Sequence, residues 1–576
     1  MSRTPLRRRA VAPAVLTATA LAIWAGGSAI AGAAPVTTLA AGPAAAAALA
    51  ANQASHDSTA DHTWNESDVA TVTLTGTGAT STSSNVTVSG STVTVSAAGT
   101  YRFSGSLTNG QIVVNSTGTG IVRLILNGVT VTNSTVAALH VVAADEVLIN
   151  LQAGSTNRLT DGSANVDAAL DSAADLTIDG TGSLIVTGNG NDGIASADGL
   201  VITGGTITVT AKDDAIRGKD YAIITGGTIT ATGGGDALKS DNDTDTTRGY
   251  VSLAGGTVTL TATADAVQAS TDVIISGGKL TAKSGGGSSV TPGTASAKGL
   301  KAGVLVVISE GTNSIDASDD GVHSDANVTV DGGTTTVATG DDGVHAETDV
   351  RVSAGTVNVT KSYEGVEGLK VYVTGGSVSA TASDDAFNAS DPTYGEMQNS
   401  PNALISITGG TVIVSGGTDG LDSNGALSIG GGNVIVAGSP TRGGGEGGLD
   451  SNGALTITAG TLVSSGLSAS TSTLPTAGQG WVSVNFSANQ AAGTIVHLAT
   501  TSGTQIATYQ SSKIFKGIIF SSSQITRGTT YAIYTGGSVS GTAVGGGLYT
   551  GGTLSGTQST TVTAGTSTGT GGGGPR

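Results

Sequence analysis

Paired acidic residues recur at a fixed interval in the middle of the 576-residue chain. The stretch DDGVH begins at Asp319 and again, 22 residues later, at Asp341. Further acids stand at Asp213–Asp214, Glu364 and Asp384–Asp385. Carboxylates that lie close together repel one another unless a cation lies between them, and Ca²⁺ takes about six to eight oxygen ligands. With no Cys and only six His in the chain, a hard ion is favoured over a soft metal, so Ca²⁺ is the expected cofactor.

The acids belong to an internal repeat with a base step of 22 residues and longer steps where loops are inserted. The register is set by the residue before each Gly/Ala–apolar pair: Asp192, Asp214, Asp236, Asp265, Lys298, Asp320, Asp342, Glu364, Asp385, Asp419 and Gly447. Each unit also holds a strand, a turn and a second strand, as in LVITGGTITVT. Such a small unit cannot bury its own apolar face, but stacked copies can, which predicts a parallel β-helix over residues 121–470. A β-propeller competes, although its blades need about 40 residues each.

In a β-helix, equivalent residues of successive coils lie about 4.8 Å apart, so the register residues form a column. Two interpretations of this column remain open. The acids hold Ca²⁺, with ligands expected from Asp319, Asp320, Asp341, Asp342, Glu364, Asp384, Asp385, Asp213 and Asp214. Alternatively, the second acid of each pair is a corner residue that accepts hydrogen bonds from turn N–H groups, and the ladder is structural.

A varied set of polar residues follows the column three positions later in each unit. Its members are Arg217, Lys239, Gln268, Lys301, His323, His345, Glu367, Asn388, Asp422 and Asp450. Strand alternation places them outward, either as a solvated face or as a strip that contacts a ligand. Long insertions flank this strand, as in SDNDTDTTRG and KSGGGSSVTPGTAS, and could form the walls of a groove.

Composition and local sequence patterns indicate the fold class and the boundaries of the segments. The chain has 91 Gly and a net charge of −18, which favours an all-β fold and cationic partners over nucleic acid or anionic lipid. Arg7–Arg9, an apolar run and Ala29-Ile30-Ala31 predict a signal peptide over 1–31, hence a secreted or cell-surface protein without a membrane span after cleavage. We expect a disordered Ala-rich linker over 32–66, an N-terminal β segment over 67–120, a small β-sandwich-like cap over 478–540 and a disordered tail over 541–576. We expect a monomer.

Several ordered motifs resemble those of the secreted carbohydrate-binding β-helix proteins of bacteria, which are pectate-lyase-like in fold. They include GTYRFSGSLTNGQIVVN, RLILNGVTVTN, DDAIRGKD, GDDGVHAE, SYEGVEG and SKIFKGIIFSS, and they span Val69 to Gly537. The resemblance implies a right-handed parallel β-helix, Ca²⁺ bound by stacked acids and affinity for cellulose or polygalacturonate. The sugar contacts expected on this chain are Lys298, Lys301, His323, His345, Tyr363 and Glu367.

Three functions compete on this sequence: a non-catalytic, Ca²⁺-dependent polysaccharide binder, a Ca²⁺-dependent pectate-type lyase, and a structural adhesin. A lyase would need a Lys or Arg base, and only Lys298 and Lys301 flank the register at a suitable place. The repeat region has no Trp on which a neutral sugar could stack, which favours acidic polysaccharide bridged by Ca²⁺. We therefore expect the non-catalytic binder.

Overall fold

The computed structural model describes residues 44–163, 166–439, 447–468, 470, 472–565 and 567–568. The expected signal peptide and the first part of the expected linker, residues 32–43, lie outside this range. The described chain is all-β apart from helix α1 (Ala44–Ala51) and the 3-10 turn η1 (Glu66–Asp68), which confirms the predicted class. Within the same residues, no helix is long and apolar enough to cross a membrane.

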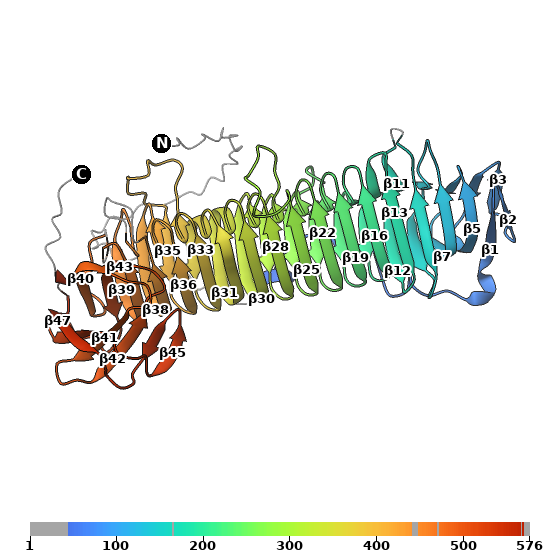
Figure 1. The fold of residues 1–576 in the computed structure, drawn as a ribbon. Helices are drawn as coiled ribbons and strands as arrows, with labels where there is room; N and C mark the ends of the chain where they lie inside the picture. Colours follow the sequence, from blue (N-terminus) through green and yellow to red (C-terminus); the bar gives the residue numbers. More distant parts are fainter. Residues whose placement is uncertain are drawn as a thin grey trace, which may run out of the picture. The chain divides into compact units, whose positions relative to one another are not determined.

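Most strands belong to one large, mostly parallel sheet, in which strands pair with their counterparts one repeat further along the chain (Figure 1). The first series comprises β1 (Ala70–Gly76), β5 (Gly99–Thr108), β7 (Ile121–Thr132), β9 (Glu146–Leu151), β12 (Asp175–Gly180), β15 (Gly199–Ile202), β18 (Tyr221–Ile224), β21 (Tyr250–Leu253), β24 (Asp272–Ile275), β27 (Leu305–Ile308), β30 (Asn327–Thr339), β31 (Val344–Ser362), β32 (Val366–Val373), β35 (Leu404–Ile407), β38 (Ala426–Ala437) and β39 (Leu455–Gly466).

Two further series run beside it, and the longest strands contribute to more than one series. The second comprises β10 (Thr156–Thr160), β13 (Ser183–Gly188), β16 (Thr206–Ala211), β19 (Thr228–Gly233), β22 (Thr257–Ala262), β25 (Lys279–Ser284), β28 (Thr312–Ala317), β33 (Ser377–Ala382) and β36 (Thr411–Ser415). The third comprises the short strands β4 (Thr92–Val95), β6 (Gln111–Asn115), β8 (Leu139–Ala143), β11 (Ala168–Ser172), β14 (Asp192–Ser196), β17 (Ile216–Gly218), β20 (Leu238–Ser240), β23 (Val267–Ala269), β26 (Leu300–Ala302), β29 (Val322–Ser324), β34 (Phe387–Ala389) and β37 (Leu421–Ser423).

The pairings confirm the 22-residue register. Val322 pairs with Val344 and His323 with His345, both in parallel, so the two DDGVH copies lie on neighbouring strands. Parallel pairing also begins earlier than the expected boundary at residue 121, because β1 pairs in parallel with β5 and β4 with β6. Residues 67–120 are therefore largely part of the same stacking. Their antiparallel pairs are β1 with β2 (Ala79–Ser81) and β3 (Val86–Ser89) with β4.

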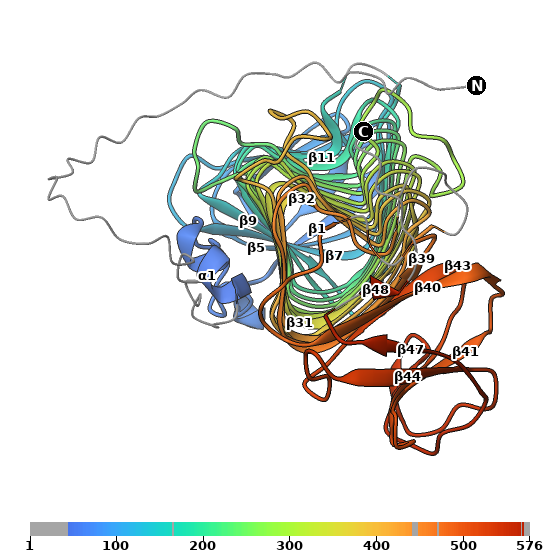
Figure 2. The same cartoon turned by 90° about the vertical axis from the view of Figure 1, so that its left-hand side faces the viewer.

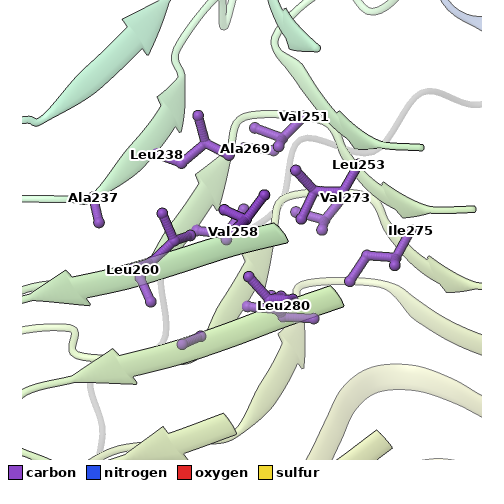
Figure 3. Packing of buried hydrophobic residues seen from close by; sticks show 14 of the residues in the cluster. Ala237, Leu238, Val251, Leu253, Val258, Leu260, Ala269, Val273, Ile275 and Leu280 are labelled. Atoms are coloured by element: carbon purple, nitrogen blue, oxygen red, sulfur yellow. The ribbon is translucent and has the colours of Figure 1, made fainter. Parts of the chain in front are cut away.

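Aliphatic side chains of successive repeats fill the interior. Leu238, Val251, Val258 and Leu280 are each at most 2% exposed and point toward one another (Figure 3). The Gly of DDGVH is set by this packing, because a Cβ on Gly321 would lie 2.2 Å from a methyl of Val337. Thus in the two DDGV units the Val enters the core, the Gly leaves room for Val337 or Val359 across the interior, and the acid before them stands at the turn.

The last strands form two sheets around a second apolar cluster that contains Val463, Val484, Leu498, Phe515 and Ile533. In the large sheet, β43 (Phe515–Ser521) pairs antiparallel with β39 and with β40 (Trp481–Gln490), and β48 (Ser567–Thr568) pairs with β40. The other sheet has six strands: β41 (Ile495–Thr500), β42 (Gln505–Gln510), β44 (Thr530–Thr535), β45 (Thr542–Gly545), β46 (Leu548–Thr550) and β47 (Thr557–Thr563).

The six-stranded sheet continues into the span expected to be a disordered tail. Strands β45, β46 and β47 all lie beyond residue 541. Leu548 and Val562 are buried in the apolar cluster, and that burial orders this Gly- and Thr-rich sequence. The expectation of a disordered tail is therefore wrong for the described residues 541–565.

The second half of the expected linker is also ordered, and we call residues 44–68 the strap. Helix α1 lies on the outside of the stacked strands (Figure 2). Its Ala45 and Ala48 pack in a cluster that includes Tyr221, Tyr250 and Ile274. The strap then follows the repeats in reverse order. The N–H of Ala44 donates to the Asp331 carboxylate at the start of the strap. Further along the strap, the Arg123 guanidinium donates to the carbonyl of Asp61.

Polar side chains fix the strap along its length. The hydroxyl of Tyr250 donates to the Gln53 carbonyl, and His56 contacts the Tyr221 hydroxyl at 2.8 Å. His62 lies 2.7 Å from Asp179. The prediction of a disordered linker is thus wrong for residues 44–66, because an Ala-rich segment without apolar periodicity still packs where its small side chains fit against flat strands and large aromatics.

We expect the strap to stabilise the repeats beneath it. Removing residues 1–68 exposes Tyr221 and Tyr250, and it should cost on the order of 3 kcal/mol relative to a variant that lacks residues 1–43 alone. Thermal unfolding of the two variants measures the difference. Equal Tm values would show that the strap rests on the strands without stabilising them.

Candidate functional site

The register residues lie at one turn of each repeat and form a hydrogen-bonded column that is interrupted at Lys298, where the N–H of Asp320 donates instead to Asp319 Oδ1. In most other repeats one carboxylate oxygen accepts the backbone N–H of the next column residue. The N–H of Asp236 donates to Asp214 Oδ1 at 2.8 Å, and that of Asp265 donates to Asp236 Oδ1 at 2.9 Å. The same bond joins Asp342 to Asp320 and Asp419 to Asp385. These contacts are those of the structural ladder, so the column Asp residues that make them have a role in folding.

The second carboxylate oxygen faces the outward row, the residues three positions after the column. In the first half of the repeat region this row is basic. The Arg217 guanidinium lies 2.9 Å from Asp192, and the Lys239 ammonium lies 2.9 Å from Asp236 and 3.0 Å from Asp214. Burial lowers the pKa of Lys239, but its two carboxylate partners outweigh burial and raise the pKa overall. Here the column is neutralised by the protein itself.

Lys298 takes the place of an acid in the column and neutralises the next repeat. Its ammonium lies 2.5 Å from Asp320 Oδ2 and 3.1 Å from Asp319 Oδ1. Asp320 is fully buried, and burial alone would raise its pKa. The hydrogen bond from His323 and the charges of Lys298 and His345 outweigh burial and hold the pKa of Asp320 well below its usual range.

His323 is held between two carboxylates, with Nδ1 2.9 Å from Asp320 and Nε2 3.0 Å from Asp325. Burial lowers the pKa of His323, but the hydrogen bonds to Asp320 and Asp325 raise it overall. A ring with both nitrogens on carboxylates is an imidazolium. The ring of His345 stacks edge-on with that of His323, at a centroid distance of 5.0 Å, and lies 3.2 Å from Asp342.

The outward row changes sign after His345. Its next members are Glu367, Asn388, Asp422 and Asp450. Burial, then the charge of Asp385, raises the pKa of Asp419 to about 8. Burial, then the charge of Asp450, raises the pKa of Asp422 to about 7. Among the residues that the structure describes, no ammonium or guanidinium group forms an ion pair with Asp419 or Asp422, unlike the acids of the earlier repeats.

Glu364 and Glu367 lie at the start of the acidic half. Burial, then the charge of Asp342, raises the pKa of Glu364 well above its usual range. Burial and the charge of Glu364 do the same for Glu367. The Asn388 amide donates to Glu364 at 2.8 Å. An amide brings no charge, so a bound cation would favour the ionised form of Glu364, whereas Glu367 lies 3.4 Å from His345 Nδ1.

The structure separates the expected metal ligands into two environments. Carboxylate oxygens of Asp319, Asp320 and Asp341 lie within 4.8 Å of one another, close enough to share one ion. Lys298 already neutralises two of them, so a metal ion here competes with an internal cation. Asp214 likewise pairs with Lys239, while Asp213 lies exposed beside it.

The acidic half suits a hard divalent ion by the type and charge of its donors, whereas the described groups of three candidate ligands within 4.8 Å of one another lie earlier in the column, the last being Asp342, His345 and Glu367. Its donors are carboxylates and an amide, which suit Ca²⁺, and the repulsion among them favours a cation. Glu364, Asp384 and Asp385, all expected as ligands, lie here, whereas the sequence analysis did not count Asp419 and Asp422 among the ligands. Their signal was nevertheless present in the sequence, as the change from basic to acidic residues along the outward row.

The expected sugar contacts are also divided. Lys298 is 7% exposed and His323 4%, and the polar atoms of both are bonded to carboxylates, so neither presents a free group to a polysaccharide. Lys301 is more open and lies 3.4 Å from Asp265. Tyr363 is 48% exposed beside the column, and its hydrogen bond to Asp384, together with burial, raises its pKa.

Breaking the Lys298–Asp320 pair should be severe, because it leaves a buried charge without its partner. Lys298→Met should cost about 3–5 kcal/mol of unfolding free energy. Adding Asp320→Asn to it should restore much of this loss, because the amide keeps the hydrogen bond to Asp342 without a charge. Denaturant unfolding measures both. Lys301→Met is the matched control, and a loss as large as that of Lys298→Met would contradict the assignment.

The raised pKa values in the acidic half predict a pH dependence. An unfolded Asp titrates near about 3.9. Between about pH 4 and pH 8 the folded chain therefore keeps protons at Asp419 and Asp422 that the unfolded chain has lost, and the unfolding free energy falls as pH rises. In chelator, Tm should fall more steeply over this window for the wild type than for Asp419→Asn/Asp422→Asn. Parallel curves for the two proteins would refute the assignment. Asp213→Asn, at an exposed site, is the control.

The known proteins with related sequences are described as carbohydrate-binding. The family described as carbohydrate-binding domain-containing protein matches residues 89–343 and 341–533. A relative with the same description, from Acetivibrio thermocellus, is 37% identical over 126 residues, which cover 20% of this chain and 44% of that protein. The chain thus spans less than half of that relative's length.

A solved structure is also similar in part, described as the polysaccharide lyase-like protein from C. thermocellum in a gadolinium derivative. It is 26% identical, covers 50% of this chain and 96% of its own, and superposes with a TM-score of 0.36, which is too low to bear on the fold. The family match is different in extent, since its two segments together span most of the described strands. The chain belongs to the carbohydrate-binding domain-containing protein family.

Proposed function

We propose that this protein is a secreted, non-catalytic binder of acidic polysaccharide, such as polygalacturonate, and that Ca²⁺ bridges the acidic half of the column to uronate carboxylates. The scaffold we infer is a right-handed parallel β-helix closed by the C-terminal β-sandwich. The family match supports carbohydrate as the ligand. The observation that carries the finer proposal is the change of charge along the outward row after His345.

The residues we assign to Ca²⁺ are the carboxylates from Glu364 onward, namely Glu364, Glu367, Asp384, Asp385, Asp419 and Asp422. An acidic surface cannot attract a polyanion unaided, whereas a divalent ion bound to it can. When bound, Ca²⁺ supplies positive charge and exchangeable coordination positions for a sugar carboxylate. The exposed ring of Tyr363, at the edge of this region, offers an apolar face to a pyranose ring.

Two observations favour binding over turnover. A lyase needs a base with an available lone pair near the bound sugar, and Lys298 is a buried ammonium held by two carboxylates. Its pKa is also shifted in the wrong direction for a base, since burial lowers it but the charges of Asp320 and Asp319 raise it overall. Neutral crystalline sugar is disfavoured as well, because Trp481 is buried and Trp64 lies on the strap.

The proposal predicts binding that depends on Ca²⁺ and on the acidic half. Polygalacturonate affinity should fall at least about tenfold in EDTA and in Asp419→Asn/Asp422→Asn, because each change removes the bridge. Asp213→Asn should bind as the wild type does. Calorimetry and pull-down on insoluble polysaccharide measure these changes.

Four outcomes would decide against the proposal. Affinity that ignores EDTA would exclude the Ca²⁺ bridge. Stronger binding to cellulose than to polygalacturonate would move the ligand to neutral glycan. A steady release of unsaturated product that is abolished by Lys301→Ala would establish the lyase, whereas a protein that binds none of these polysaccharides would favour the adhesin.

A further inference from the structure

A groove of about 490 Å³ lies between the outer faces of β33, β36 and β38 and the six-stranded sheet. Its floor is a row of side chains in parallel register, in which Ser379 pairs with Ile413 and Ile413 with Ile435. Its wall is formed by the segment after β42 and by the turn between β45 and β46. The groove faces away from the apolar interior of the repeats, since the residues flanking Ile413 in β36, Val412 and Val414, are the buried ones.

The groove holds Lys513, whose partners differ from those of the lysines along the column. The Lys513 ammonium donates to the Gly416 carbonyl at 2.5 Å, and among the described residues no carboxylate pairs with it. Burial lowers the pKa of Lys513, and no charge of another described residue offsets that effect. By contrast, Lys239, Lys298 and Lys301 all lie within 3.4 Å of an acid. In a protein of net charge −18, an unpaired and half-buried ammonium is conspicuous.

We propose that this groove binds a carboxylate-bearing sugar unit, with the Lys513 ammonium as its charge partner. The inference rests on the proposed function in one respect, that the ligand is an acidic polysaccharide. The cavity volume falls within the range of about 300–1,000 Å³ that is typical of small-molecule sites. An ammonium has three donors, so two remain for a ligand after the bond to Gly416.

The lining suits a pyranose ring. Hydroxyl groups of Thr381, Ser415 and Ser512 offer donors and acceptors to sugar hydroxyls. Ile413 and Gly546 give an apolar surface for the carbon face of the ring, and Gly546 lies against Ile413 so closely that a Cβ there would approach its methyl to 2.9 Å. The groove therefore combines one cation, several hydroxyls and one apolar strip.

The groove begins beside the acidic half of the column. Gly416, which accepts from Lys513, stands three residues before Asp419 on the same turn. A uronate chain held through Ca²⁺ at the column can thus place a neighbouring carboxylate on Lys513. The two contacts differ in one testable way, because the second needs no metal.

The test uses the full mature protein and a short ligand, trigalacturonate, in EDTA. Calorimetry should detect weak binding to the wild type, about tenfold weaker binding to Lys513→Met, and binding close to wild type for Lys513→Arg. The methyl ester of the same trisaccharide should bind the wild type no better than the acid binds Lys513→Met. Lys516→Met, in the same segment, is the matched control and should behave as the wild type.

A second measurement locates the contact without a variant. Amine acetylation followed by mass spectrometry should show that trigalacturonate protects Lys513 and leaves Lys516 unchanged. Equal affinity of the wild type and Lys513→Met, or equal binding of acid and methyl ester, would overturn the inference. A change in Tm without a change in affinity would also overturn it, because Lys513 would then be structural. Polysaccharide binding that does not depend on Ca²⁺ would contradict the proposed function but would not change the binding of trigalacturonate to Lys513 in EDTA. The failure of the proposed function and the failure of this inference can therefore be distinguished.

Discussion

The structure depends on one constraint, which is that parallel stacking at a 22-residue step places identical residues on top of one another. Two carboxylates about 5 Å apart repel by roughly 3 kcal/mol at an effective dielectric near 20. A column of them is compatible with a marginally stable fold only if each is compensated. Backbone N–H groups supply part of this, as in the bond from Asp342 to Asp320, and the outward row, bound protons or a bound cation supply the remainder.

The two halves of the column solve this problem differently. In the first half Arg217, Lys239 and Lys298 are internal cations, so the ladder is complete within the protein. In the second half Asp419 and Asp422 compensate by holding protons at neutral pH. A carboxyl group that burial and neighbouring acids keep protonated can exchange its proton for a metal ion. The Ca²⁺ site that we propose in this half follows from that property.

The all-β class and the repeat were predicted from the sequence alone. So were the residues that lie next to each other on adjacent strands, because residues one period apart are paired, as His323 is with His345. It did not separate the structural acids from the candidate ligands, since that depends on which partner each carboxylate meets across repeats. Lys298 illustrates the difference. Its type and position suggested a sugar contact or a base, and only burial against Asp319 and Asp320 shows it to be an internal counter-ion.

The strap and the late strands were missed for a related reason. Both are rich in small residues, and neither carries the periodicity that marks an element from sequence. Their order comes from the surfaces they meet: Ala45 and Ala48 fit against Tyr221 and Tyr250, and Leu548 enters the apolar cluster of the C-terminal sheets. A repeat scaffold offers long, regular faces, and weakly patterned segments can become ordered on them. The Lys513 groove arises in the same way, where a late turn closes over an outer strand face and leaves a cation without an internal partner among the described residues.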